Sequence, residues 1–362
     1  MYRAKRFGWK HQNFEKRIKQ IILRKIKEIL GIGLLFLLSI TTALGQGPSL
    51  SPYDLKESYL EKKAAFKRDD TKGLSTDEKA QLDRIVSILE KNASNSFEYH
   101  FVKYVNGRYD LSLSKHLMEA QRLQPDNRDL IAELFSYYLL TNNEGQAKIY
   151  AQQILGAVSS NTQVYYKALT ADPTVSALIV CGEEDGLPLL ALQSTGQINK
   201  NLKIINLDFL LNDKYRAKIN SAYSLGNIEF LNNEKAYLMK LLPKGGSGMA
   251  ISTTVNQSYF TLFSNKVFLT GLSYRYGSEN QMIHLQNFWT RAQKELKSLT
   301  LNNRAERKLY RNYLPPLMTY YQLAPKGSDL RTAIKRVLLK LTDQTGKKDE
   351  VIAILIAYDK IE

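Results

Sequence analysis

The chain has 362 residues and 44% of them are hydrophobic, so it is long enough for two compact domains with packed cores. Its formal net charge is +16, yet residues 1–30 alone carry ten Lys or Arg against Glu15 and Glu28. Half of the positive charge therefore lies in one terminal segment, which argues against nucleic acid as a partner. The single cysteine, Cys181, excludes an internal disulfide and a zinc site built on cysteines.

The N-terminal segment has the order of a secretory signal. The basic residues 1–28 precede the uncharged, apolar residues 29–44, and Ala43-Leu44-Gly45 places small residues two apart. The apolar run has about 16 residues, which is short for a bilayer span. We expect residues 1–45 to be either a signal peptide cleaved after Gly45 or an uncleaved signal anchor. Both place the rest of the chain in the periplasm or facing it, and membrane contact is expected only through an uncleaved segment.

Residues 46–165 are expected to form a helical domain that begins with a short Gly-, Pro- and Ser-containing linker. The sequence Ser75-Thr76-Asp77-Glu78 opens one helix, Gly107 ends another, and Pro125-Asp126-Asn127 separates two more. Apolar side chains at helical spacing form five stripes. These stripes are Leu82, Ile85, Ile88 and Leu89; Phe97, Phe101, Tyr104 and Val105; Leu113, Leu117, Ala120 and Leu123; Leu130, Leu134, Tyr137 and Tyr138; and Ala147, Tyr150, Ala151 and Ile154.

Short helix pairs closed by a Pro-Asp-Asn turn resemble tetratricopeptide repeats, here over about residues 94–156. Ala120 and Pro125 stand where that repeat has a small residue and a terminal proline, but the second copy lacks its closing proline. Stacked repeats need neighbours to bury their faces, so the flanking segments must supply them. The alternative is a generic helical bundle.

From Thr174 the pattern changes to short apolar runs that predict strands over residues 175–181, 202–207, 249–255 and 266–272. Helices are expected between them at 186–192 and 213–221, and after them at about 280–298, 303–322, 328–342 and 348–359. Strand, helix and strand in succession predict a parallel sheet with right-handed crossovers. The expected fold class is therefore α plus α/β. Tetratricopeptide-like hairpins precede a small, Rossmann-like, mostly parallel domain at 166–300, and C-terminal helical hairpins at 301–362 pack on it.

A series of motifs in the back half carries a family resemblance. They are residues 180–189 (VCGEEDGLPL), 192–193 (LQ), 203–207 (KIINL), 210–212 (LLN), Tyr215 and 267–275 (VFLTGLSYR). This series resembles the soluble extracytoplasmic C-terminal module of bacterial protein O-mannosyltransferase-like membrane proteins, over about residues 175–355. Glu183 and Glu184 stand where that family has Asp and Asn. The family's many membrane helices have no counterpart here, so the resemblance implies a shared soluble module and not glycosyltransferase activity.

The acidic turn Glu183, Glu184 and Asp185 is the main site candidate, because it follows a predicted parallel strand at the end where α/β sheets usually bind ligands. Three carboxylates could hold a divalent cation through oxygen ligands. The alternative is that they cap the following helix, whose N-terminus favours negative side chains.

Arg275, at the end of the last predicted strand, is the second candidate. It is expected either to form an ion pair with the acidic turn or to bind a ligand. The four histidines are scattered along the sequence without metal-ligand spacing, so we expect no metal site from them. No catalytic residue and no cofactor are predicted, apart from the divalent cation considered at the acidic turn.

Three functions remain open from the sequence. The leading hypothesis is a non-catalytic periplasmic or envelope-associated protein that binds a protein or peptide partner through its helical repeats. The second, which rests on the family resemblance, is an accessory component of envelope glycan or glycoprotein assembly. The third is a metal-dependent hydrolase centred on the acidic turn.

Overall fold

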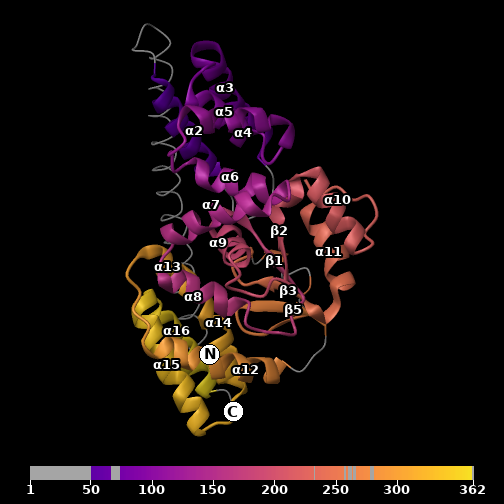
Figure 1. The fold of residues 1–362 in the computed structure, drawn as a ribbon. Coiled ribbons are helices and arrows are strands. Elements are labelled where there is room, and N and C mark those ends of the chain that lie inside the picture. Colours follow the sequence, from indigo (N-terminus) through magenta and orange to yellow (C-terminus); the bar gives the residue numbers. More distant parts are fainter. Residues whose placement is uncertain are drawn as a thin grey trace, which may run out of the picture. The chain divides into compact units, whose positions relative to one another are not determined.

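The computed structural model describes residues 50–66 and 74–360, except 232, 257, 260–262, 264–265 and 278–280 (Figure 1). The chain divides into two units, Met1–Asp54 and Leu55–Glu362. The expected signal segment lies outside the described residues. None of the helices that the structure describes is both long and apolar enough to cross a membrane. The unit Leu55–Glu362 is mostly helical and contains one five-stranded mixed sheet, which confirms the combination of helices with an α/β part.

The segment before the sheet is helical. Its elements are α2 (Pro52–Phe66), α3 (Thr76–Ala93), α4 (Phe97–Asn106), the 3₁₀ turn η1 (Leu111–Leu113), α5 (Ser114–Leu123), α6 (Leu130–Leu140), α7 (Glu144–Ala157) and α8 (Ser160–Leu169). The Ser75 hydroxyl accepts a hydrogen bond from Glu78 N, and the Glu78 carboxylate accepts one from Ser75 N, so a complete capping box starts α3. Gly107 caps the end of α4.

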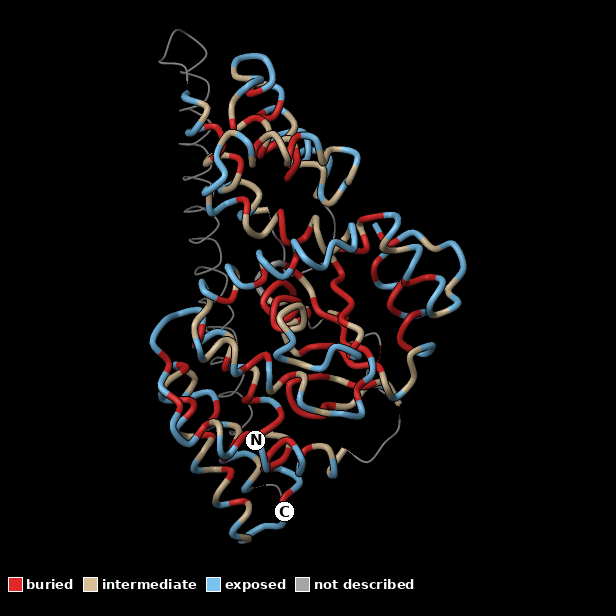
Figure 2. Tube along the Cα trace, viewed as in Figure 1, coloured by how far each residue is buried: buried red, intermediate tan, exposed pale blue. Residues whose placement is uncertain are grey.

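Three hydrophobic clusters stabilise the unit Leu55–Glu362, and buried residues concentrate along the central strands and α9 (Gly182–Ser194) (Figure 2). The N-terminal core contains buried residues of the helices from α2 through α6, the first being Leu55 and the last Leu134. The next residue, Phe135, already belongs to the central core, which continues through α7 and α8 to one face of the sheet. The expected boundary at residue 165 therefore falls inside α8 and inside a shared core.

The sheet has the order β2-β1-β3-β5-β4. Its strands are β1 (Ala177–Val180), β2 (Lys203–Asn206), β3 (Met249–Ser252), β4 (Val267–Leu269) and β5 (Ser273–Tyr276). The first three are parallel, whereas β5 is antiparallel to both β3 and β4. The expectation of a mostly parallel sheet is corrected to a mixed one. The predicted strand over 266–272 ends early, because Gly271 has a φ of 134° and the chain turns back into β5.

Helices cover both faces of the sheet. The connection from β1 to β2 is α9, whose leucines pack in the central core against Leu178 and Val180. The connection from β2 to β3 contains η2 (Leu207–Leu211), α10 (Asp213–Ala222) and α11 (Glu234–Gly245), which pack in a second core against Ala177 and Ile179. Alternate residues of β1 thus point to opposite faces, as a strand requires, and both faces are apolar.

The C-terminal segment is again helical and shares the central core with α9. Its elements are α12 (Gln281–Lys297), α13 (Arg304–Tyr310), the 3₁₀ turn η5 (Arg311–Tyr313), α14 (Leu314–Leu323), α15 (Asp329–Thr345) and α16 (Lys348–Lys360). The single helix expected over 303–322 is divided by η5, where Pro315 and Pro316 begin a new helix.

Candidate functional site

The carboxyl ends of β1, β2 and β3 lie at one edge of the sheet. The chain leaves β1 over one face through α9, then leaves β2 over the other face to reach β3 on the far side of β1. This change of direction between neighbouring strands is where open α/β sheets usually bind ligands. The polar groups that follow these strand ends are therefore the first place to look for a site.

The acidic residues lie inside the first turn of α9, because the helix begins at Gly182 and not at the expected residue 186. The Asp185 carboxylate accepts a hydrogen bond from the Tyr166 hydroxyl at 2.9 Å. The structure does not describe the side chains of Glu183 and Glu184. Among the residues it does describe, no three His, Cys, Asp or Glu side chains gather as a metal-binding group. The backbone places three acidic residues in the first turn of a helix, where the dipole favours negative charge.

Asn206 ends β2 and is almost fully buried, with 1% of its surface exposed. Its Oδ1 accepts a hydrogen bond from Asp208 N at 3.1 Å, while its Nδ2 has no acceptor within the described part of the chain. A Cβ added at Gly186 would lie 2.5 Å from this Nδ2. Gly186, just after the first turn of α9, is thus required for the close approach of β2.

Arg275 lies at the opposite edge of the sheet from the acidic residues. The register pairs Arg275 of β5 with Ala250, near the amino end of β3. Its Nε donates to the Ser247 carbonyl at 2.8 Å, and its Nη2 donates to the same carbonyl. Its Nη1 donates to the Thr174 hydroxyl at 2.8 Å. The structure therefore does not bring Arg275 to the acidic turn, and that expected ion pair is wrong.

Asp172 is a carboxylate partner of Arg275, with Oδ2 3.6 Å from Nη1 and 3.7 Å from His284 Nδ1. Burial acts to raise the pKa of Asp172. The hydrogen bonds from Thr174 and the charge of Arg275 outweigh this effect, so the pKa lies below its usual range. With only 2% of its surface exposed, Arg275 joins the segment after α8 to the start of β3 and to α12, which is a structural role.

Two histidines that look unrelated in the sequence meet in the structure. His100 of α4 and His116 of α5 approach with their Nδ1 atoms 2.9 Å apart, so one ring donates a hydrogen bond to the other. Burial lowers the pKa of both imidazoles. The sequence could have predicted this contact. His100 and His116 are equally distant from the α4–α5 turn near residue 108, so they lie at the same level of an antiparallel helix pair.

The helical hairpins carry a groove of about 370 Å³ between the α5–α6 turn and α7. The buried side chains Leu130 and Leu134 and the half-buried Ile131 and Tyr150 form its apolar part. Its polar rim consists of Asp126, Asn127, Arg128 and Gln153, next to Pro125. The groove therefore has a small apolar floor inside a predominantly polar edge.

Comparisons of the chain with protein-family models, with curated proteins and with solved structures found no match.

Proposed function

We propose that this chain is a non-catalytic protein of the cell envelope that binds a protein or peptide partner through its N-terminal helical hairpins. The observation that carries the proposal is the groove between the α5–α6 turn and α7. Its apolar floor can bury side chains of a partner segment, and its polar rim can pair with that segment's backbone and charges. The location in the envelope rests on the signal-like order of residues 1–45.

The finer architecture supports a binding role. Consecutive helices pack as neighbours, α3 with α4, α4 with α5 and α6 with α7, and α7 packs against α9. We interpret α4–α7 as a tetratricopeptide-like array whose last layer is closed by the sheet domain. The sheet, with parallel β2-β1-β3 and helices on both faces, is interpreted as a Rossmann-like module that supports this array.

The two alternative functions have weaker structural support. An accessory role in envelope glycan or glycoprotein assembly is supported only by the resemblance over residues 175–355. A metal-dependent hydrolase would need basic or nucleophilic groups around the acidic turn, whereas Arg275 lies at the other edge of the sheet.

Site-specific photocrosslinking in intact envelopes tests the proposal. A photoreactive amino acid replaces Gln153, which is exposed and lines the groove, and in a control chain it replaces Lys148, which is exposed on the same helix outside the groove. We expect a discrete protein adduct from position 153 and none from position 148. The adduct should disappear when Ile131→Asp places a charge in the apolar floor. Equal adducts from both positions, or none from position 153, would contradict the proposal.

A further inference from the structure

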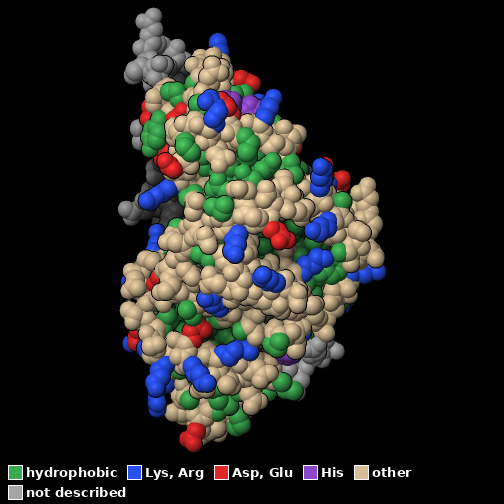
Figure 3. Space-filling view, viewed as in Figure 1, with side chains coloured by type: hydrophobic (Ala, Val, Ile, Leu, Met, Phe, Trp, Pro, Cys, Tyr) green, Lys and Arg blue, Asp and Glu red, His purple; other side chains and the backbone are tan. Residues whose placement is uncertain are grey.

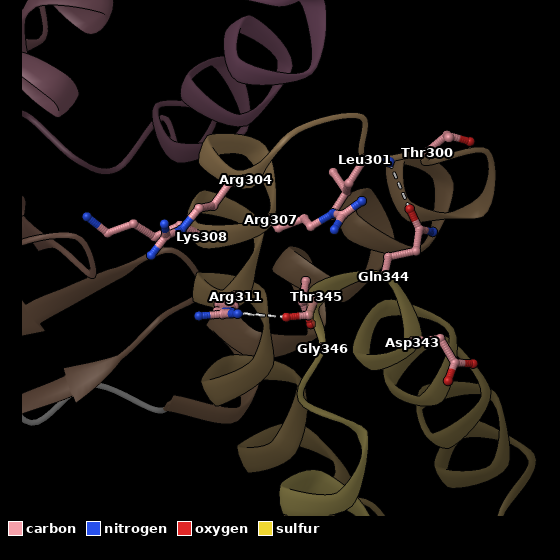
Figure 4. A pocket seen from close by; sticks show the side chains of 10 residues that line it. All are labelled: Thr300, Leu301, Arg304, Arg307, Lys308, Arg311, Asp343, Gln344, Thr345 and Gly346. Atoms are coloured by element: carbon pink, nitrogen blue, oxygen red, sulfur yellow. Dashed lines mark hydrogen bonds between the residues drawn. The ribbon is translucent and has the colours of Figure 1, made fainter.

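A second, larger hollow of about 880 Å³ lies among the C-terminal helices (Figure 4). One wall comes from α13 and η5, and the other from the end of α15 and the segment before α13. The lining residues are Thr300, Leu301, Arg304, Arg307, Lys308, Arg311, Asp343, Gln344, Thr345 and Gly346.

The lining is strongly basic. Its four cations, Arg304, Arg307, Lys308 and Arg311, follow one another at positions i, i+3, i+4 and i+7, so they share one face of the α13–η5 segment. All four are exposed. Neither Arg304 nor Arg307 has a hydrogen-bond or ion-pair partner within the described part of the chain. Arg307 extends toward Leu301 and Gln344, whereas Arg304 extends to the other side beside Lys308 (Figure 4). The hollow is thus lined by two separated guanidinium groups whose donors are open to a ligand.

The surrounding charge reinforces this character. Residues 281–360 contain fifteen Lys and Arg against seven Asp and Glu, a net charge of +8. Lys and Arg side chains outnumber Asp and Glu over this part of the visible face (Figure 3). Asp343, a carboxylate of the lining, forms an ion pair with Lys348 at 2.8 Å, which offsets its charge. The field at the hollow thus attracts anions.

The opposite wall is held in place. Arg311 donates through Nε and Nη2 to the Thr345 carbonyl at 3.1 and 2.9 Å. The Gln344 side chain accepts a hydrogen bond from Leu301 N and donates one to the Leu299 carbonyl, both at 2.9 Å. These bonds join α13, α15 and the segment between α12 and α13, so the hollow is formed before any ligand arrives.

We propose that this pocket binds a ligand that carries at least two oxyanion groups, phosphoryl or carboxylate. Guanidinium groups bind both types through paired N–H donors. The basic face extends over roughly 10 Å, which is longer than one phosphate, so it matches a ligand with spaced negative charges. The volume is in the range of small-molecule sites. This site is separate from the hairpin groove and does not depend on the proposed partner.

Isothermal titration calorimetry on the full chain, with tripolyphosphate and separately with citrate, tests the proposal. The pocket variant carries Arg304→Gln and Arg307→Gln, and the control carries Arg291→Gln and Arg336→Gln. The control residues are exposed cations of α12 and α15 that do not line the pocket. All chains keep the same basic residues 1–30, and the two variants have the same net charge.

We expect the pocket variant to lose at least roughly tenfold in affinity while the control stays within about twofold of the parent. Selective binding of tripolyphosphate would assign phosphoryl chemistry, and selective binding of citrate would assign carboxylate chemistry. Equal losses in the two variants would show unspecific attraction to net charge and overturn the proposal. So would the absence of binding of either probe by the parent chain at about 1 mM.

Discussion

Two helical regions of this chain have the same type of secondary structure and different charge. Residues 50–157, which contain the hairpins, hold fifteen Lys and Arg against sixteen Asp and Glu, whereas residues 281–360 hold fifteen against seven. The balanced region carries a groove with an apolar floor, and the basic region carries a hollow lined by four cations. We therefore expect the distribution of charge over the packed helices, and not helix packing alone, to determine what each region binds.

The buried titratable groups also differ between the two regions. Burial lowers the pKa of His100 and His116 in the hairpins. In the C-terminal region burial raises the pKa of Glu295, although hydrogen bonds from Tyr313 at 2.5 Å and Tyr310 at 3.3 Å act in the other direction. Acidification should therefore weaken the hairpins through these two histidines, whereas protonation of Glu295 by itself favours the folded state.

The largest expected effect comes from separating the regions. Fragment 166–362 lacks α7 and half of α8, which supply Ala147, Ala151, Leu155 and Tyr165 to the central core. We expect this fragment to lose cooperative thermal unfolding, measured by circular dichroism, because its core is exposed. If fragments 46–165 and 166–362 each unfold cooperatively, the two regions are separate domains with a boundary near residue 165.

The next effect concerns Arg275, which links Asp172 and Thr174, after α8, to Ser247, just before β3. Arg275→Leu removes the cation beside Asp172, which keeps its hydrogen bonds from Thr174, and removes a donor to the Ser247 and Thr174 carbonyls. We therefore expect a loss of about 3–5 kcal/mol in the free energy of unfolding, measured with urea. Arg291→Leu on the exposed face of α12 should change it by less than about 0.5 kcal/mol. A loss below about 1 kcal/mol for Arg275→Leu would show that this link contributes little to the stability of the fold.

The His100–His116 pair predicts a pH dependence specific to the hairpins. Both imidazoles have a folded-state pKa below the ordinary value of 6.5. As the pH falls through about 6.5, the unfolded chain takes up protons that the folded chain does not, so stability decreases, by up to about 1.4 kcal/mol per pH unit for each proton. Urea unfolding between about pH 7.5 and 5.5 measures this slope. The double variant His100→Asn and His116→Asn should have a flatter slope. An unchanged slope would show that these two histidines do not cause the pH dependence of stability.

The acidic turn should show the smallest effect. Replacing Glu183, Glu184 and Asp185 by Gln, Gln and Asn removes their interaction with the dipole of α9 and should cost about 1 kcal/mol. Calcium, magnesium and manganese should not change the melting temperature of the parent chain. A metal-dependent rise that the triple variant loses would support the hydrolase hypothesis, since a ligand at a hundredfold excess over its dissociation constant stabilises by about 2.7 kcal/mol.

Local signals in the sequence predicted much of the fold. The capping residues Ser75 and Glu78 placed α3, and continuous apolar runs placed β1 and β2 because both faces of these strands are covered. Helix α8 was missed, although Ser159 caps it. Helix α11 was also missed, although Tyr237, Leu238, Leu241 and Leu242 form a helical stripe there. The glycines that follow α11 concealed the signal, because glycine-rich segments usually mark loops.

The site could be predicted less well because its contacts are distant in sequence. Arg275 meets Thr174, Ser247 and His284, and only the sheet register brings these residues together. The sequence correctly predicted that the acidic residues 183–185 follow β1. It placed them in a turn before the helix, whereas they lie inside α9. The spacing of Arg304, Arg307, Lys308 and Arg311 in the sequence predicts the basic face of α13. The opposite wall of the pocket comes from α15, which is distant in sequence, so it could not be predicted.

Hydrogen–deuterium exchange of the full chain with and without tripolyphosphate tests the difference between the two helical regions most directly. We expect slower exchange in peptides that cover residues 300–311 and 343–346, which contain the lining of the basic pocket. We expect unchanged exchange across residues 97–157, where the charge is balanced. Slower exchange across the hairpins, or no change near the pocket, would contradict this difference.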